Sequence, residues 1–485
     1  MIKLDAFGKN DIRGIYGDTV TEDLFYYVGK AYVKYVQYRT KKEKVVISLI
    51  RDVRLSSLPL MKSLLKGILD AGGNAVNLGM GPTPLAYFSE FSEVTVSMNV
   101  DASLIVTASH NPPEYNGLKM TCQQKSLNEE QIQEVKNLTQ QVIDGKVVFN
   151  GLTGSYTKID ITEDYINTLL AMYGDDKKNV KIVTDCANAS AGVIAPKLLK
   201  ALGYDVVELY TEPDGTFPNH HPNPSIESTL EELKKTVVAT GADVGVAFDG
   251  DADRIGVIDA DGNYLTGDKL LYFYAATDIA PLHKGAADKP TVVSEVKCSQ
   301  VLFDSLEKLG INAVMCKTGH GFIKAKMAET GAVAAGEMSG HMFFADRWFG
   351  FDDAVFAAAR LGYIIYTLKQ KNPDFKMSDV LKPFASVYTS PEIRFPCADE
   401  LKKPILQKLE KMIIANPDLF RDTIKEIIKL DGLRIVFNGG FAMIRQSNTE
   451  PVFTLRFEGK TKDKCDGYRD ALINQLEKLC SEMKG

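Results

Sequence analysis

The chain has 485 residues, of which 45% are hydrophobic and 25% charged, which is the composition of a folded globular protein too long for one core. The net charge of −6 excludes a strongly basic surface, so we expect no nucleic-acid partner. No apolar run reaches about 18 residues, so we expect no membrane segment. The 7 cysteines form no Cys-x-x-Cys pair, which indicates reduced thiols and favours the cytoplasm.

A pattern of strand, helix, glycine and strand occurs three times along the chain. The first strands span 44–50, 180–185 and 291–295. Amphipathic stretches follow at 57–71, 192–202 and 300–309, and each ends at a glycine. The second strands include 75–76, 204–207 and 311–314. Each copy predicts a βαβ unit with a parallel pair of strands.

Each copy is followed by another apolar strand that runs into a polar loop. The strands at 103–106, 242–248 and 332–335 lead into the loops at 107–113, 249–254 and 336–341. Ligands of open α/β sheets bind at the carboxyl ends of the strands. We therefore expect three equivalent domains that each contribute one loop to one cleft.

The last part of the chain differs from the repeats. A helix at 353–369 and a linker at 371–374 precede a strand at 393–396, helices at 400–414 and 417–423, strands at 433–437, 440–445 and 453–458, and a helix at 464–483. Strands joined by short turns favour an antiparallel sheet. The predicted fold is α/β: three tandem related α/β domains with mixed sheets, 1–155, 156–262 and 263–372, plus a C-terminal α+β domain, 383–485, around a central cleft.

Ser109 lies in the first polar loop, Thr-Ala-Ser-His-Asn-Pro-Pro. Two prolines can continue neither a strand nor a helix interior, so the serine is expected on a stiff turn at the end of a buried strand. Lys119 follows closely enough to bring a cation back to it. The alternative is an ordinary Asn-Pro turn that contains a serine.

Asp249, Asp251 and Asp253 stand at alternate positions of the second polar loop. Oxygen ligands at this spacing suit Mg²⁺, which would relieve the repulsion between the carboxylates. An EF-hand loop would need a glutamate where Ala260 stands. Arg254 beside the acids suits a phosphate or a carboxylate. A solvated acidic turn is the weaker interpretation, because the preceding strand is wholly apolar.

Two further loops offer groups for binding. The third polar loop contains Glu337, Ser339 and His341 between glycines, and His320 also lies between glycines. Such groups suit hydrogen bonds to vicinal hydroxyls, although a structural loop explains them equally well. The segment 445–451 brings together an arginine, two hydroxyls and an amide, which suits an anion. A capped turn is the alternative.

Together these loops supply a nucleophile, a metal site, a loop suited to hydrogen-bonding a sugar and a site suited to binding a phosphate. Phosphoryl transfer needs little else from a protein. A covalent phosphoserine at Ser109 is the simplest interpretation. Water as the acceptor would make the chain a phosphatase, and a substrate hydroxyl would make it a mutase. The residue chemistry leaves both open.

The four loops, in this order, resemble those of the α-D-phosphohexomutase family. Residues 107–112 resemble its phosphoserine loop, 249–254 its metal loop, 336–341 its sugar-binding loop and 445–449 its phosphate-binding loop. Stretches at 11–14, 217–222, 296–298 and 347–353 resemble its bacterial phosphomannomutase/phosphoglucomutase branch. One departure is Ala252, which stands where most relatives have glycine and matters only if this residue needs a positive φ.

The resemblance implies an isomerase that moves a phosphoryl group between the 1- and 6-positions of mannose and glucose phosphates. Phosphorylated Ser109 would give its group to the sugar, through a hexose 1,6-bisphosphate that also primes the enzyme. Mg²⁺ would be held by Ser109, Asp249, Asp251 and Asp253. Candidates around the reacting phosphate and for proton transfer are Ser109, Arg13, Lys119, Arg254 and His341. Candidate substrate contacts are His110, Lys297, His320, Glu337, Ser339, Arg445, Ser447, Asn448 and Thr449. Alternatives are a phosphoglucosamine mutase, a phosphatase and a non-catalytic sugar-phosphate sensor.

Overall fold

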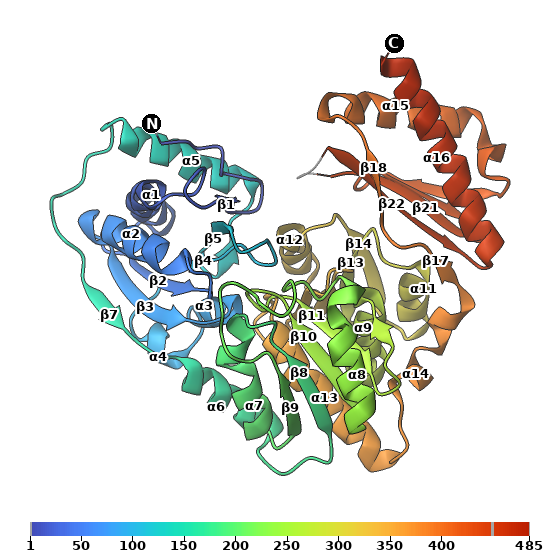
Figure 1. The fold of residues 1–485 in the computed structure, drawn as a ribbon, viewed down its shortest axis with the longest axis horizontal. Helices are drawn as coiled ribbons and strands as arrows, with labels where there is room; N and C mark the ends of the chain where they lie inside the picture. Colours follow the sequence, from blue (N-terminus) through green and yellow to red (C-terminus); the bar gives the residue numbers. More distant parts are fainter. Residues whose placement is uncertain (1, 448–450, 485) are drawn as a thin grey trace. The chain divides into compact units, whose positions relative to one another are not determined.

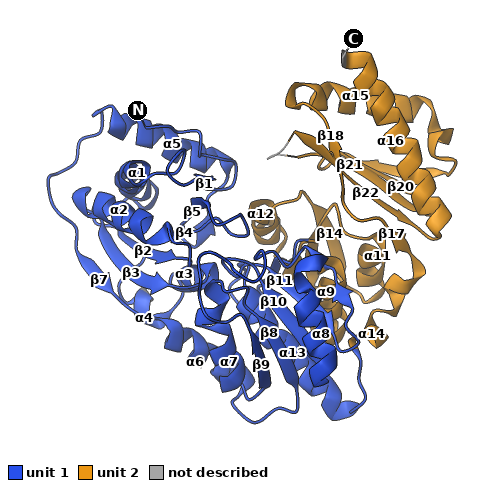
Figure 2. Cartoon of the chain, in the orientation of Figure 1, with its two compact units in different colours: residues 1–266, 339–376 blue, residues 267–338, 377–485 orange. Residues whose placement is uncertain are grey.

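The structure is a computed structural model that describes residues 2–447 and 451–484, so the predicted contacts Asn448 and Thr449 lie outside the described residues. The chain divides into two compact units (Figure 2). Unit 1 comprises 1–266 and 339–376, and unit 2 comprises 267–338 and 377–485. The four domain boundaries stay predictions. Among the described residues, no helix is both long and apolar enough to cross a membrane.

The first part of unit 1 is a seven-stranded sheet in the order β1-β5-β4-β2-β3-β7, with β6 beside β5. Its strands are β1 (Ile12–Ile15), β2 (Val46–Arg51), β3 (Asn74–Met80), β4 (Ala102–Val106), β5 (Tyr115–Cys122), β6 (Lys125–Ser126) and β7 (Tyr156–Lys158). Strand β2 runs parallel to both β3 and β4, whereas β5 is antiparallel to β4. The predicted parallel pair is confirmed.

Alternation along the central strand assigns its side chains to the two faces of this sheet. The helices are α1 (Glu22–Thr40), α2 (Ser57–Asp70), α3 (Thr83–Phe88), α4 (Glu93–Val96) and α5 (Glu129–Ile143). Ile47 and Leu49 join the apolar core under α1, α2 and α5, which cover one face (Figure 1). Ser48 points the other way and bonds to Ser89, after α3, and to Ser103.

The second part of unit 1 repeats this arrangement in a five-stranded sheet, β12-β11-β10-β8-β9. Its strands are β8 (Lys181–Asp185), β9 (Asp205–Leu209), β10 (Val244–Phe248), β11 (Ile255–Asp259) and β12 (Tyr264–Leu265). Strand β8 is parallel to β9 and β10, and β11 is antiparallel to β10. Its helices are α6 (Thr162–Tyr173), α7 (Ala195–Ala201) and α8 (Glu231–Thr240), with 3₁₀ turns η1 (Ser190–Val193) and η2 (Glu227–Leu230).

Two details of unit 1 refine the sequence-based prediction. The helix expected at 192–202 begins only at Ala195, after the turn η1, where Pro196 suits a first helical turn. The last segment of unit 1 contains β16 (Met342–Phe344) and α13 (Ala354–Lys371). Helix α13 starts where expected, because the Asp353 carboxylate accepts the Phe356 N–H at 2.8 Å.

The first part of unit 2 contains the third copy of the repeat. Its strands β13 (Thr291–Glu295), β14 (Asn312–Cys316) and β15 (Ala334–Gly336) lie in the order β14-β13-β15, and both pairs are parallel. Its helices are α9 (Gly267–Tyr274), α10 (Ala280–Leu282), α11 (Gln300–Lys308) and α12 (His320–Thr330), with the short π-helix η3 (Ala275–Ile279). The order equals β3-β2-β4 and β9-β8-β10, so the threefold repeat is confirmed.

The second part of unit 2 is an antiparallel sheet in the order β17-β22-β21-β20-β19, with β18 beside β22. The strands are β17 (Tyr388–Thr389), β18 (Ile393–Pro396), β19 (Ile424–Ile428), β20 (Leu433–Phe437), β21 (Gly440–Gln446) and β22 (Val452–Gly459). The helices are α14 (Met377–Val380), η4 (Lys382–Ser386), α15 (Asp399–Ala415), η5 (Pro417–Phe420) and α16 (Lys462–Lys484). The α+β prediction is confirmed, although β19, a partly exposed edge strand, was not predicted.

Candidate active site

Ser109 stands on a strained turn just beyond the carboxyl end of β4. Its φ is +50°, in the left-handed region that non-glycine residues rarely adopt. The side chain is buried, and Oγ donates to Asp249 Oδ2 at 2.7 Å. His110 Nδ1 lies 3.3 Å from the same Oγ. The serine lies on a turn at the end of a buried strand, as expected, and meets the acidic loop directly.

The acidic loop follows β10 at the equivalent place in the second sheet. Asp249, Asp251 and Asp253 are all buried, and each has a carboxylate oxygen within 4.8 Å of the others. Burial, with the charges of Asp253 and Asp251, raises the pKa of Asp249 well above its usual value. Among the described residues, Asp251 Oδ1 has no hydrogen-bond partner. An oxygen cluster with an unsatisfied buried acceptor fits a hard divalent cation such as Mg²⁺.

Two positions of this loop, Gly250 and Ala252, have specific backbone requirements. A Cβ on Gly250 would lie 2.2 Å from the carbonyl oxygen of Ser109, so only glycine lets the two loops approach this closely. Ala252 has φ +56°, so the position does require the backbone that glycine adopts more readily.

Two cations of unit 1 lie beside these loops. Lys119, on β5, donates from Nζ to Asp251 Oδ2 at 2.6 Å and also to Asp253. Burial lowers the pKa of Lys119, but the two carboxylates outweigh it and raise the pKa well above the usual value. Arg13 donates to Asn111 Oδ1 at 2.8 Å, within the serine loop, and to Asp11. Lys119 thus reaches the acidic loop rather than the serine.

Arg254, His341 and Ser339 form a chain of contacts, also in unit 1. Arg254 Nε donates to His341 Nε2 at 3.3 Å, and His341 Nδ1 lies 2.9 Å from Ser339 Oγ. His341 Nε2 is also 3.4 Å from Asp253 Oδ1.

The imidazole of His110, beside Ser109, is neutral at pH 7. Burial, together with Arg254 and Arg13, lowers the pKa of His110 well below its usual value.

The remaining predicted contacts lie in unit 2. Glu337 is buried and accepts the Gly319 N–H at 2.7 Å, which links it to the start of α12 at His320. Lys297 Nζ lies 3.7 Å from Glu295 and 3.4 Å from Glu392. Burial lowers the pKa of Lys297, and these two carboxylates reverse the effect, so the net shift is upward.

The phosphate-loop candidates Arg445 and Ser447 also lie in unit 2. Arg445 Nε donates to Asp431 Oδ2 at 3.0 Å, and the same oxygen accepts the Thr318 N–H at 3.2 Å. Lys402 Nζ donates to the Ser447 carbonyl at 3.0 Å. Sequence analysis missed Asp431 and Lys402, because nothing in their local sequence distinguishes them from ordinary surface residues.

The structure thus gathers one group of predicted residues in each unit. Unit 1 holds Ser109, His110, Arg13, Lys119, Asp249, Asp251, Asp253, Arg254, Ser339 and His341. Unit 2 holds Lys297, His320, Glu337, Arg445 and Ser447. The first group joins a hydroxyl, a carboxylate cluster and cations, which is chemistry for phosphoryl transfer. The second joins hydrogen-bonding groups and cations, which is chemistry for holding a sugar phosphate.

Comparison with known proteins agrees with the chemistry of these two groups of residues. Models of the phosphoglucomutase/phosphomannomutase family match four successive segments: alpha/beta/alpha domain I at 4–144, domain II at 163–262, domain III at 266–384 and the C-terminal domain at 392–475. The chain is 37% identical over 480 residues to the phosphomannomutase/phosphoglucomutase of Pseudomonas aeruginosa, covering 98% of this chain and 96% of the relative. It is 39% identical over 461 residues to the phosphoglucomutase of Neisseria meningitidis, covering 95% and 94%.

A solved structure shows the same similarity in three dimensions. The crystal structure of a phosphoglucomutase/phosphomannomutase family protein from Burkholderia thailandensis matches with a TM-score of 0.86 and 35% identity, covering 99% of this chain and 98% of that one. Four family segments in order, full-length relatives and a matching fold lead to one conclusion: the chain belongs to the phosphoglucomutase/phosphomannomutase family, the α-D-phosphohexomutases.

Proposed function

We propose that this enzyme interconverts the 1- and 6-phosphates of mannose and of glucose, with Mg²⁺ and a phosphorylated Ser109. The observation that carries the proposal is the 2.7 Å contact between Ser109 Oγ and Asp249, on a turn that holds the serine at φ +50°. A strained, buried serine against a carboxylate cluster suits a nucleophile that must meet a phosphoryl group and a cation together.

The proposed reaction has two balanced halves. In the first, the P–Oγ bond of phospho-Ser109 breaks while a bond forms between phosphorus and the free hydroxyl of the hexose phosphate. The proton of the sugar hydroxyl passes, through a neighbouring acid–base group, to the released Ser109 Oγ, and the products are a hexose 1,6-bisphosphate and a free Ser109 hydroxyl. In the second, the other phosphoryl group moves to Ser109 Oγ, and the proton of that hydroxyl passes to the sugar oxygen that is released. Ser109 ends phosphorylated, as it began.

The chain's own groups have distinct proposed roles in these steps. Arg13, Lys119 and Arg254 offset negative charge on the transferring group. His341, between Ser339 and Arg254, and Lys119 are the candidates to hold or move the proton. Asp249, Asp251 and Asp253 would hold Mg²⁺, which when bound neutralises charge on phosphoryl oxygens.

The substrate contacts are proposed mainly for unit 2, where Glu337 and Lys297 meet the sugar phosphate, with Ser339 of unit 1 as a further sugar contact. Arg445 and Ser447, with Asn448 and Thr449 outside the described residues, would hold the phosphate that does not react. Hexose phosphates are the proposed ligands, with hexose 1,6-bisphosphate as primer. The cytoplasm stays a prediction.

One experiment separates this function from its alternatives. Purified protein with Mg²⁺ and a trace of glucose 1,6-bisphosphate is mixed with mannose, glucose and glucosamine 1-phosphates and followed by ³¹P NMR. We expect mannose and glucose 6-phosphates to form. Conversion of glucosamine 1-phosphate alone would instead identify a phosphoglucosamine mutase. Release of inorganic phosphate alone would identify a phosphatase, and an unchanged spectrum would point to a sensor.

Ser109→Ala tests the nucleophile. Alanine cannot carry the phosphoryl group, so we expect turnover to fall to the background rate while the protein stays folded. Ser48→Ala, another buried serine on β2, is the matched control and should retain activity. Near-normal turnover of Ser109→Ala would remove phosphoserine chemistry from the proposal. The measurement is coupled steady-state turnover of glucose 1-phosphate.

Asp251→Asn tests the proposed metal site. Loss of a carboxylate ligand lowers affinity for a hard cation, so the Mg²⁺ concentration for half-maximal activity should rise at least about tenfold. Asp259→Asn is the control, because Asp259 is also buried but caps the turn after β11. A Mg²⁺ titration of turnover measures both variants. Equal Mg²⁺ requirements in Asp251→Asn and wild type would contradict the assignment.

A further inference from the structure

Arg54 is a fully buried side chain directly behind the serine loop, and no motif of the sequence analysis included it. A guanidinium group has five N–H donors, and all five of these donate. Nε donates to Asp52 Oδ2 at 3.1 Å. Three carbonyls of the serine loop accept three of the other N–H groups, at Ser109 (2.9 Å), Asn111 (2.6 Å) and Pro112, and the carbonyl of Tyr115 at the start of β5 accepts the last at 3.0 Å.

The serine loop needs such a partner because of its sequence. Pro112 and Pro113 have no N–H, so the loop has few backbone donors of its own, although the Pro112 carbonyl also accepts the Tyr115 N–H at 3.1 Å. A buried carbonyl without a donor destabilises the folded state. One side chain therefore satisfies four acceptors and fixes where the backbone of residues 109–115 lies.

Asp52 extends the same support to the other side of Ser109. Its Oδ2 accepts from Thr107 Oγ1 at 2.7 Å. Thr107 Oγ1 in turn accepts the Ser109 N–H at 3.0 Å. The N–H of Ser109 is thus held through Thr107, and its carbonyl directly by Arg54. A φ of +50° persists only where the surroundings determine it, and these two bonds do so.

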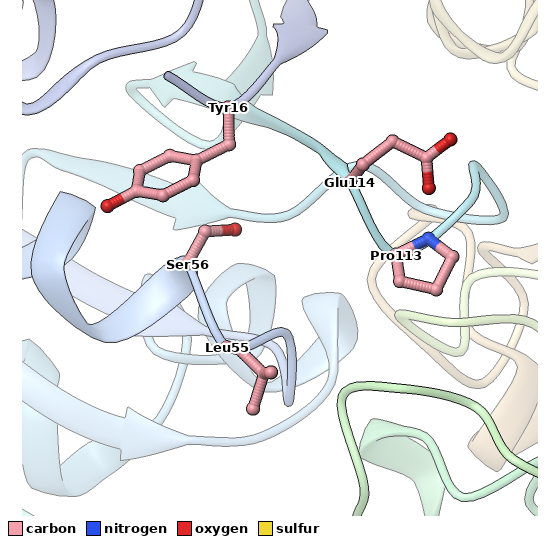
Figure 3. Close-up of a pocket in the computed structure, with 5 residues that line it drawn as sticks. All are labelled: Tyr16, Leu55, Ser56, Pro113 and Glu114. Atoms are coloured by element: carbon pink, nitrogen blue, oxygen red, sulfur yellow. The ribbon is translucent and has the colours of Figure 1, made fainter.

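Packing holds the guanidinium but not the far side of the loop. The Phe217 ring centroid lies 5.2 Å from Arg54, and a Cβ on Gly215 would lie 2.5 Å from the Val53 carbonyl. On the outer side, a pocket is lined by Tyr16, Leu55, Ser56, Pro113 and Glu114 (Figure 3). Since Pro113 and Glu114 border this pocket, packing does not enclose that part of the segment, and Arg54 holds the adjoining backbone through the Pro112 and Tyr115 carbonyls.

We propose that Arg54, oriented by Asp52, is a positioning residue for phosphoryl transfer: it holds the Ser109 turn so that Oγ points to the Asp249 loop. The inference rests on the proposed function. It extends that function to a residue that touches neither substrate nor the transferred group.

The test is the rate at which Ser109 becomes phosphorylated in Arg54→Lys. Lysine keeps the charge but has three donors on one nitrogen, so it cannot span four carbonyls. Displacement of a reacting atom by about 1 Å costs about 100-fold in rate. We therefore expect the single-turnover rate with glucose 1,6-bisphosphate, followed by intact mass, to fall about 100-fold per folded molecule. The KM for glucose 1-phosphate should change less than about threefold.

Arg360→Lys is the matched control. Arg360 is equally buried in unit 1, donates to both Asp346 oxygens at 2.7 and 2.6 Å, and has the Phe344 ring 4.5 Å away. It should lose thermal stability but keep the phosphorylation rate. If both variants lose only stability and keep the rate, the inference is overturned. If wild-type Ser109 is not phosphorylated at all, the proposed function has failed instead.

Thr107→Val covers the case in which Arg54→Lys does not fold. Valine has nearly the same shape but cannot accept the Ser109 N–H or donate to Asp52. The expected phosphorylation rate is about tenfold lower, which corresponds to about 1.4 kcal/mol in activation free energy. An unchanged rate in a folded Thr107→Val protein would overturn the inference.

Discussion

At the scale of single residues, the backbone strain at Ala252 can be tested by substitution. Its left-handed φ of +56° costs about 1–2 kcal/mol for a residue with a Cβ. Glycine would relieve that cost but would lose about 0.8 kcal/mol of methyl burial and about 0.4–1 kcal/mol of backbone entropy. We expect Ala252→Gly to change the free energy of unfolding by less than about 1 kcal/mol and to keep its turnover.

Ala247→Gly is the control for this balance. Ala247 is equally buried on β10 but has extended backbone with no strain to relieve, so glycine there should destabilise by about 1–2 kcal/mol. Urea unfolding measures both variants. A loss at Ala252 as large as that at Ala247 would mean that the left-handed angle carries little strain.

At this scale the sequence could predict the contact between the serine loop and the acidic loop, but not the residues that support these loops. Ser109 and Asp249 stand at the ends of apolar strands, which is a local pattern. Arg54 and the Ser109 carbonyl are 55 residues apart, so their contact depends on the register of β2 beside β4. Asp52 and Arg54 do follow β2, so polar residues after the neighbouring strand were the available signal. Asp431 had none.

At the scale of elements, the imidazole of His220 links the loop after β9 to the end of β8. His220 Nε2 lies 3.1 Å from both oxygens of Asp185, and His220 Nδ1 lies 3.0 Å from the His221 carbonyl. Burial lowers the pKa of His220, but the hydrogen bond and charge of Asp185 outweigh it, so the net pKa is raised. Protonated His220 therefore stabilises the native state.

The pH dependence follows from that upward shift. The stabilisation is complete below the ordinary histidine pKa of about 6.5 and is lost as pH rises through the raised value. His220→Gln should therefore lower the urea midpoint more at about pH 5.5 than at about pH 9. Asp185→Asn, which removes the same pair from the other side, should show the same trend. An equal loss at both pH values would exclude an ionic contribution.

The elements themselves were the most predictable part of the chain. Strands β2, β8 and β13 each have two parallel neighbours, and they follow from apolar runs that precede an amphipathic stretch ending at a glycine. The start of α7 was predicted a turn too early, because η1 and α7 share one apolar stretch, and Pro196 in the first turn of α7 is the sequence signal for where the α-helix begins. Strand β19 was missed because edge strands need no alternation of buried residues.

At the scale of the whole molecule, the residues proposed for phosphoryl transfer and the arginine proposed to hold the unreactive phosphate lie in different units. Ser109 and its acidic loop belong to unit 1, and Arg445 belongs to unit 2. Arg445→Ala removes a charged hydrogen bond worth about 1.5–3 kcal/mol, so KM for glucose 1-phosphate should rise about 10- to 100-fold. Arg469→Ala, on the exposed surface of α16, should leave KM unchanged.

The lifetime of phospho-Ser109 without sugar separates these roles further. Under the proposed function, slow attack by water on the phosphoserine would use the serine turn, Arg13, Lys119 and the acidic loop, all of which belong to unit 1. We therefore expect Arg445→Ala to keep the wild-type lifetime, measured by intact mass over time, while its KM rises. A lifetime that changes in parallel with KM would mean that Arg445 also acts on the reacting group. Its role would then be catalytic rather than confined to holding the distant phosphate.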